Sequence, residues 1–194
     1  MANTRHASAL IPIILFLNLF LIIASLAATF CRNSTWLNDV SLYEDVTKKS
    51  YYKLRVHLNL GKAYKSNNLL NRAIEEYALV IKNYETYSDL SEAYNNLGRV
   101  YEQMGDLDMA LKAYGQAIKY DPHSSVAFNN LGLIYLQRNE LDTAIKQFRA
   151  SIFYSPDYAK AHLNLARALA VKGDNKEAER EMYISRKLGI AGGN

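Results

Sequence analysis

Cysteine, proline and glycine are all scarce in this 194-residue chain, and each scarcity excludes a class of structure. The one cysteine, Cys31, cannot form an internal disulfide or build a cysteine-rich metal site, and we expect it to be a buried or interfacial free thiol. Three prolines and nine glycines argue against a loop-rich β-sandwich and favour long helices. An excess of one charge is also lacking, because a net charge of +4 is too small to indicate a nucleic-acid partner.

Residue types that carry out catalysis or bind metals do not converge at any spacing in the sequence. His57 and His162 occupy large-residue positions of predicted helices, so we expect them to be packing residues. Four acidic residues are predicted to lie on solvated helix surfaces: Glu75, Glu76, Glu179 and Glu181. No glycine-rich phosphate loop is present. The sequence therefore predicts no catalytic residues, no metal site, no cofactor and no enzymatic activity.

A long uncharged stretch lies near the start of the chain. Residues 10–30 contain no charged side chain, and as a helix they would reach about 31 Å, the thickness of a bilayer core. We predict a transmembrane helix or signal anchor over 10–30 after an N-terminal flank at 1–9, which makes the protein single-pass. The alternative is a signal peptide cleaved near Ala28, which would remove residues 1–27 and yield a secreted protein. The flanking charges do not decide the orientation.

A repeated Leu-Gly or Leu-Ala dipeptide is the strongest pattern in the sequence. It occurs at 60–61, 97–98, 131–132 and 165–166, so its spacings are 37, 34 and 34 residues. Large residues recur around it at i, i+3, i+4 and i+7, the apolar stripe of a helix. Two units also share matching positions further along: Ala110, Tyr114, Ala117 and Pro122 in one, and Ala144, Phe148, Ser151 and Pro156 in the other. Each proline is expected to end a second helix, and the turns between helices are expected at 105–106 and 173–174.

The period and these residues resemble the tetratricopeptide repeat, a pair of antiparallel helices of 34 residues. The resemblance covers 54–188 and implies an all-α solenoid of about four helix-turn-helix repeats at 54–90, 91–124, 125–158 and 159–188, followed by a flexible tail at 189–194. Three extra residues near 84–90 predict a longer connection after the first repeat, or a longer second helix within it.

Residues 33–53 are predicted to form a juxtamembrane capping helix. Trp36, Val40 and Tyr43 follow i, i+4, i+7 spacing, and the end of a solenoid needs a cover. Residues in and around this segment resemble the tail of multi-pass O-mannosyltransferases of the GT-C type that carry C-terminal tetratricopeptide repeats: Thr29, Arg32, Asn33, Trp36, Leu42, Tyr43, Asp45, Lys49 and Ser50. Because one predicted span precedes the repeats here, the resemblance implies a repeat module on the extracytoplasmic side of a membrane rather than an enzyme.

The first helix of each repeat carries a stripe that is expected to face a concave groove. Four asparagines recur on it, and they resemble the asparagine ladder of O-GlcNAc transferase repeats: Asn59, Asn96, Asn130 and Asn164. An amide both donates and accepts, so such a row can bind the main chain of an extended peptide. Asn-Leu-Gly is also ordinary repeat consensus, so the row need not bind anything. Five cations outnumber Glu92 on the stripe and favour an acidic partner: Arg55, Lys62, Arg99, Lys160 and Arg167.

These features together predict a membrane-tethered protein–protein interaction scaffold that binds an extended peptide or partner protein in the concave groove. The alternative is a detached acceptor-binding or regulatory module associated with a membrane glycosyltransferase. The expected partner is a protein or peptide of acidic character and not a nucleic acid, with a membrane contacted through residues 10–30. The pattern indicates neither an oligomeric state nor the identity of the partner.

Overall fold

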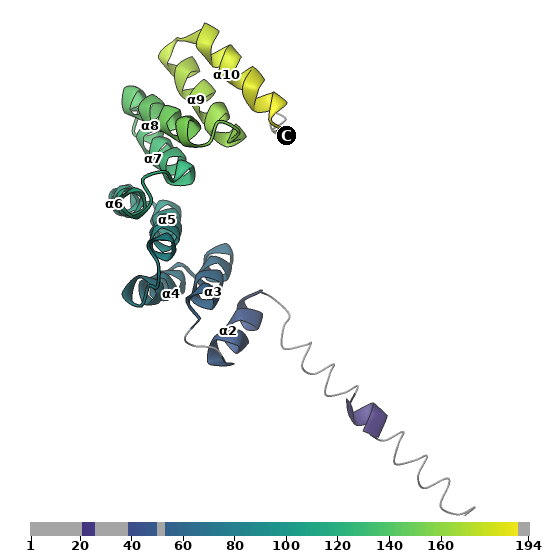
Figure 1. The fold of residues 1–194 in the computed structure, drawn as a ribbon. Helices are drawn as coiled ribbons and strands as arrows, with labels where there is room; N and C mark the ends of the chain where they lie inside the picture. Colours follow the sequence, from purple (N-terminus) through teal and green to yellow (C-terminus); the bar gives the residue numbers. More distant parts are fainter. Residues whose placement is uncertain (1–20, 26–38, 50–52, 190–194) are drawn as a thin grey trace, which may run out of the picture.

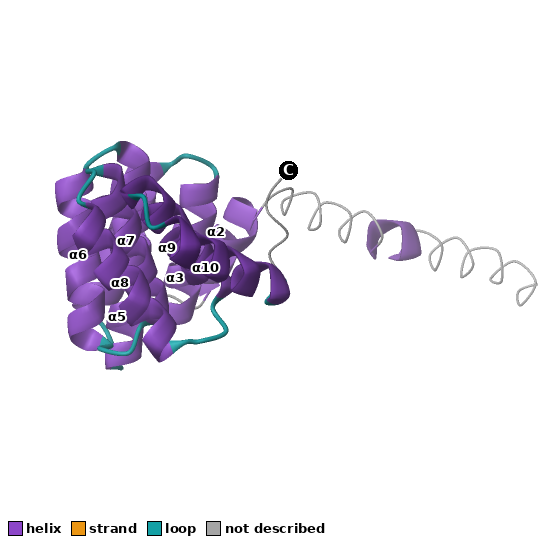
Figure 2. Ribbon diagram, turned by 90° about the horizontal axis from the view of Figure 1, so that it is seen from above, coloured by secondary structure: helices purple, strands orange, loops and turns teal. Residues whose placement is uncertain are grey.

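The computed structural model describes residues 21–25, 39–49 and 53–189, and in this part of the chain it contains helices but no strands (Figure 2). Four antiparallel helical hairpins follow one another along a curved row (Figure 1). They are α3 (Leu54–Ser66) with α4 (Leu70–Lys82), α5 (Tyr87–Met104) with α6 (Leu107–Tyr120), α7 (Ser125–Gln137) with α8 (Leu141–Tyr154), and α9 (Ala159–Lys172) with α10 (Asn175–Lys187). The expected all-α repeat solenoid is confirmed.

Each hairpin turns at one residue with a left-handed backbone. Asn68, Gly105, Asn139 and Gly173 occupy the same repeat position, with φ of 59°, 82°, 61° and 97°. Glycine adopts this conformation without steric cost, and asparagine tolerates it better than most residues. The turns predicted at 105–106 and 173–174 are therefore confirmed, and two asparagines serve the same purpose in the other hairpins.

A glycine lies against a buried aromatic ring in each of the first three hairpins. A Cβ atom built on Gly98 would lie 2.6 Å from Cε1 of Tyr114, and Gly61 and Gly132 face Tyr77 and Phe148 at the same distance. These rings are fully buried, and each belongs to a core cluster that includes residues of the next hairpin. The fourth hairpin has an alanine, residue 166, at the glycine position and a methionine, residue 182, at the ring position.

The extra residues of the first repeat lengthen α5 instead of the connection. α4 ends at Lys82, and residues 83–86 connect it to α5, a link as long as those at 121–124 and 155–158. α5 begins at Tyr87 because Thr86 and Asp89 form a capping box, in which the Thr86 side chain accepts from the Asp89 backbone N–H. The expected longer connection and longer second helix are therefore wrong, since the cap starts α5 before residue 91.

α2 (Asp39–Lys49) packs on α3 at the N-terminal end of the row (Figure 1). Val40 and Tyr43 contact the core of the first hairpin, and the Tyr64 hydroxyl donates to Oε1 of Glu44 at 2.6 Å. Burial, together with this carboxylate, raises the pKa of Tyr64 to about 12. α2 therefore covers the end of the first hairpin over residues 39–49 of the predicted capping segment at 33–53, and Trp36 lies outside the described residues.

The predicted membrane segment at 10–30 lies outside the described residues except for 21–25, which are helical. Within the described ranges, no helix combines the length and the apolar character that crossing a membrane requires. Cys31 and residues 190–194 of the predicted tail also lie outside the described part of the chain.

Candidate binding groove

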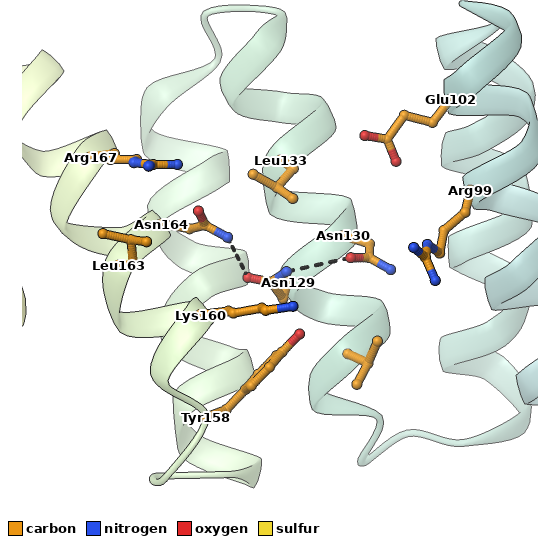
Figure 3. A pocket seen from close by; sticks show the side chains of 11 residues that line it. Arg99, Glu102, Asn129, Asn130, Leu133, Tyr158, Lys160, Leu163, Asn164 and Arg167 are labelled. Carbon is orange, nitrogen blue, oxygen red and sulfur yellow. Dashed lines mark hydrogen bonds between the residues drawn. The ribbon is translucent and has the colours of Figure 1, made fainter. Parts of the chain in front are cut away.

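A groove of ≈ 590 Å³ opens between α5, α7 and α9, the first helices of three consecutive hairpins (Figure 3). Five of the predicted site residues line it: Arg99, Asn130, Lys160, Asn164 and Arg167. α7 lies in the middle, and side chains from α5 and from the α9 side flank it (Figure 3). Part of the predicted stripe therefore lines one cavity, with Arg99 from the second hairpin, Asn130 from the third, and Lys160, Asn164 and Arg167 from the fourth.

The groove is lined by more cationic than anionic groups. Arg99, Lys160 and Arg167 are exposed, and none of them has a carboxylate within 4.0 Å among the described residues. The one acidic residue of the lining, Glu102, accepts a hydrogen bond from the Tyr114 hydroxyl at 2.9 Å. Three unpaired cations facing one carboxylate that is already hydrogen-bonded give the cavity a positive potential, which favours an anionic ligand.

The asparagine amides bond to one another across hairpins. Nδ2 of Asn130 donates to Oδ1 of Asn95 at 3.0 Å, and Nδ2 of Asn164 donates to Oδ1 of Asn129 at 2.8 Å. Nδ2 of Asn129 also donates to Oδ1 of Asn130 at 3.4 Å (Figure 3). Because each amide nitrogen carries two hydrogens, Asn130 and Asn164 keep a second donor after these bonds are made.

Only two of the four asparagines of the predicted ladder line this groove. Asn130 and Asn164 line the cavity, but Asn59 and Asn96 do not. Asn96 is only 4% exposed and Asn164 is 7% exposed although it lines the cavity, whereas Asn59 and Asn130 are half-buried. The same repeat position thus gives different exposure in different hairpins.

Two of the predicted binding cations are engaged by Glu92, at the other end of the stripe. Nη1 of Arg55 lies 2.6 Å from Oε2 of Glu92, and Nζ of Lys62 lies 2.6 Å from Oε1 of the same carboxylate. These contacts join α3 to α5, so one acidic residue neutralises two cations of the preceding hairpin. Arg55 and Lys62 belong to the predicted stripe, but the structure does not bring them into the groove of α5, α7 and α9.

Residues outside the predicted stripe also line the concave face. Tyr158, directly before α9, contributes a hydroxyl, and its burial raises its pKa while the Arg99 charge acts in the opposite direction. Leu133 occupies the repeat position of Arg99 and Arg167, whereas Leu163 lies off the stripe, and both add apolar surface. Tyr158 lies between hairpins, where helical periodicity no longer applies, so a pattern search along the helices could not identify it.

A smaller pocket continues the groove towards α3. It has a volume of ≈ 320 Å³ and is lined by Lys65, Arg99, Glu102 and Gln103. Arg99 and Glu102 line both cavities, so the two form one trough along the first helices. Lys65 was not predicted as a site residue, because it lies one helical turn from Lys62 and off the stripe.

Two buried histidines pair with glutamates that were expected to be solvated. Nδ1 of His57 lies 2.6 Å from Oε2 of Glu76, and Nδ1 of His162 lies 2.6 Å from Oε2 of Glu181. These carboxylate side chains are only 16% and 13% exposed, so the prediction was wrong for Glu76 and Glu181, because a buried imidazole needs a polar partner. It was correct for the other two acidic residues, at 75 and 179, which are exposed.

No group of three or more His, Cys, Asp or Glu side chains that could hold a metal ion occurs in the described ranges. The two imidazole–carboxylate pairs belong to different hairpins, the first and the fourth. We therefore describe them as internal contacts of the terminal repeats.

Comparison with protein families places repeat models along the hairpins. Models described as "Tetratricopeptide repeat" match residues 54–87, 91–124 and 113–146, and one described as "TPR repeat" matches residues 132–173. All four matches lie between residues 54 and 173. Most of the residues that resemble the O-mannosyltransferase tail, Thr29 to Trp36 among them, lie outside the described part of the chain. No curated protein matches the sequence.

Solved structures share the same architecture. A crystal structure of MamA has a TM-score of 0.63 and 26% identity, covering 77% of this chain and 85% of that one. A second MamA structure has a TM-score of 0.61 and 25% identity, covering 80% and 87%. YrrB, a TPR protein with an unusual peptide-binding site, has a TM-score of 0.57, covers 77% and 76%, and at 17% identity shows the fold alone. The hairpins of this chain are therefore tetratricopeptide repeats, stacked as an all-α solenoid.

Proposed function

We propose that the protein binds an extended, acidic segment of a partner protein in the trough formed by its first helices. The observation that carries this proposal is the groove of ≈ 590 Å³, where cations without a carboxylate partner stand beside amides that retain a hydrogen-bond donor. Amide groups recognise a peptide main chain whatever its side chains are, and the cations select acidic side chains.

The shape of the site also supports a chain-like ligand. The groove crosses three consecutive hairpins, and it continues into the pocket beside α3. Leu133 and Leu163 provide apolar contact between the polar groups, a mixture typical of sites that recognise peptides. A protein with the same fold, YrrB, has a peptide-binding site.

Binding measurements with a series of synthetic peptides test this proposal directly. Synthetic 12-residue peptides of graded charge are titrated against the full chain by fluorescence anisotropy at low and high salt. We expect acidic peptides to bind more tightly than neutral ones, basic peptides not to bind, and salt to weaken the acidic binders. Equal affinity for acidic and basic peptides would contradict the proposal.

The matched variant for that experiment removes two of the three asparagine amides that line the groove. Asn130→Ala with Asn164→Ala is expected to weaken binding of every peptide by roughly tenfold, because main-chain hydrogen bonds are lost whatever the side chains are. Asn59→Ala is the control, since Asn59 does not line the groove. If the double variant and the control bind alike, the amides take no part in recognition.

The proposal includes a membrane tether formed by residues 10–30, which places the groove beside a bilayer. Its support is the uncharged run itself, long enough as a helix to cross a bilayer core. Alkaline extraction of membranes from cells that express the full chain, followed by intact-mass measurement, tests it. The tether requires an extraction-resistant product that keeps residues 1–27. A soluble product, or one whose N-terminus lies near Ala28, would overturn it.

A further inference from the structure

Lys65 and Arg99 are two like charges held in one small pocket. Lys65 comes from α3 and is half-buried, Arg99 comes from α5, and both line the cavity of ≈ 320 Å³. Neither has a carboxylate within 4.0 Å in the described part of the chain. Burial and the Arg99 charge lower the pKa of Lys65, while the more weakly acting Glu102 raises it. Such a pair destabilises the empty pocket and attracts an anion.

The next hairpin shows what a different residue does at the position of Lys65. Its counterpart 37 residues later is Glu102, which accepts a hydrogen bond from the Tyr114 hydroxyl at 2.9 Å. The counterpart of Tyr114 is Tyr77, which is fully buried, and its hydroxyl has no hydrogen-bond partner among the described residues. A glutamate at position 65 would supply that partner and would also pair with Arg99.

A lysine at position 65 therefore lowers the stability of the folded protein but favours the binding of an anion. A buried hydroxyl without an acceptor destabilises the folded state, because the hydroxyl loses its hydrogen bond to water and gains none in return. Residues that break a local rule in this way are expected at functional sites, where binding compensates for the lost stability.

We propose that Lys65 and Arg99 form an anion subsite for one carboxylate side chain of the bound segment, and that Lys160 and Arg167 hold a second. This inference rests on the proposed function and adds to it the spacing, along the bound segment, of the two carboxylates that are recognised. Glu102 lines both cavities, so a singly charged carboxylate fits this trough better than a doubly charged phosphate.

The register follows from the spacing of the helices. Between two and three helix spacings separate the Lys65 and Arg99 subsite from α9, which at about 8–10 Å each is roughly 20–25 Å. An extended chain advances about 3.4 Å per residue, so the two carboxylates belong about six or seven residues apart.

The test uses synthetic 12-residue peptides with two glutamates at separations from two to nine residues in a neutral background. These are titrated against the full chain by fluorescence anisotropy. We expect the affinity to peak at a separation of six or seven residues and to fall when phosphoserine replaces either glutamate. A flat dependence on separation, or tighter binding of the phosphoserine peptides, would overturn the inference.

Lys65→Glu provides the decisive variant. It is expected to lower the affinity for the tightest-binding peptide by about tenfold or more. It should also raise the melting temperature, because Tyr77 and Arg99 both gain a partner. Lys82→Glu, at an exposed position in the last turn of α4, is the matched control: it should leave the affinity unchanged and should not raise the melting temperature, because a negative charge at a helix C-terminus is unfavourable. Lys65→Gln removes the charge without reversing it, and should show the affinity loss even if Lys65→Glu fails to fold.

The outcomes separate this inference from the proposed function. If acidic peptides bind and the Lys65 variants bind as tightly as wild type, the subsite is wrong and the groove between α5, α7 and α9 stands alone. If no acidic peptide binds wild type, the proposed function itself fails. A lower melting temperature for folded Lys65→Glu would refute the assigned relation between Lys65 and Tyr77.

Discussion

The first and fourth hairpins present the same repeat positions in opposite electrostatic states. Between α3 and α5, Glu92 lies 2.6 Å from both Arg55 and Lys62, so the cations are used within the protein. On α9, Lys160 and Arg167 have no carboxylate within 4.0 Å among the described residues. The position of Glu92 is taken by Val126 in the third repeat, so Arg99 of the second hairpin meets a valine where Arg55 and Lys62 meet a carboxylate.

A repeat consensus therefore defines the groove but not its ligand. The positions that face the groove are set by helical periodicity, which all hairpins share. Whether a cation there binds a ligand or a neighbouring hairpin depends on one side chain in the next repeat. Four predictions test this contrast and the structural differences that accompany it.

The largest expected effect comes from neutralising the cations of the last hairpin. Lys160→Gln with Arg167→Gln should lower the affinity for an acidic peptide by roughly 100-fold, because two charge-assisted contacts are lost. Arg55→Gln with Lys62→Gln is the matched pair and should change affinity by less than about threefold, since Glu92 already engages both side chains. Fluorescence anisotropy measures both, with circular dichroism to verify folding. Equal losses of affinity in the two double variants would contradict the contrast between the fourth hairpin and the first.

A second contrast concerns the glycine–ring contact. Gly98→Ala is expected to lower the free energy of unfolding by about 1–3 kcal/mol, because the new methyl group would lie 2.6 Å from the Tyr114 ring. Combining it with Tyr114→Met should recover part of the loss, since the fourth hairpin uses Ala166 with Met182. Urea unfolding measures each variant.

Gly115→Ala is the control for that substitution. Gly115 is an exposed position inside α6, and nothing lies within 4 Å of a Cβ built there. It should stabilise the protein by about 0.5–1 kcal/mol through helix propensity. If both substitutions destabilise the protein alike, the ring contact is not the reason for glycine at position 98.

Releasing the paired cations should make the first hairpin resemble the fourth. Glu92→Gln frees Arg55 and Lys62, so we expect about fivefold tighter binding of long acidic peptides and a steeper salt dependence. Asp142→Asn removes an exposed ion pair with Lys172 and should leave binding unchanged. Titrations at two salt concentrations decide the matter, and unchanged affinity after Glu92→Gln would mean that no ligand reaches the first hairpin.

The smallest effect concerns the cap that only the N-terminal end possesses among the described residues. Tyr64→Phe removes the hydrogen bond to Glu44 and should cost ~0.5–1 kcal/mol. Because the pKa of Tyr64 is raised from 10.0 to about 12, its contribution is fully present below pH 10 and is lost as the pH rises to about 12. Unfolding measured at pH 9 and pH 11.5 should therefore show a smaller alkaline loss for the variant than for wild type, whereas identical losses would contradict the role of this contact.

Features that recur once in every hairpin, at the repeat period, could be predicted from the sequence. The dipeptide at Gly98, the ring at Tyr114 and the turn at Gly105 recur at a fixed period, so their roles follow from helical geometry alone. The capping helix was predicted for the same reason, since Val40 and Tyr43 keep the spacing of a buried stripe. Each of these depends on residues close in sequence.

Features that join different hairpins could not be predicted. The ion pairs of Glu92, the amide bonds of Asn130 and the position of Lys65 depend on how successive hairpins are rotated and offset, which one sequence does not reveal. The early start of α5 was also missed, because the cap formed by Thr86 and Asp89 interrupts the repeat pattern instead of following it. A capping-box search ahead of each first helix would have found it.

The early start of α5 has a consequence for the order in which the array assembles. α5 runs for 18 residues, with a capping box at its start and a left-handed Gly105 at its end, whereas α3, α7 and α9 lack a side-chain cap. Helix nucleation is the costly step of helix formation, and a repeat array grows outward from its most stable unit. We therefore expect the second hairpin to nucleate folding and its amides to exchange hydrogen slowest, so that the groove is completed only when α9 docks.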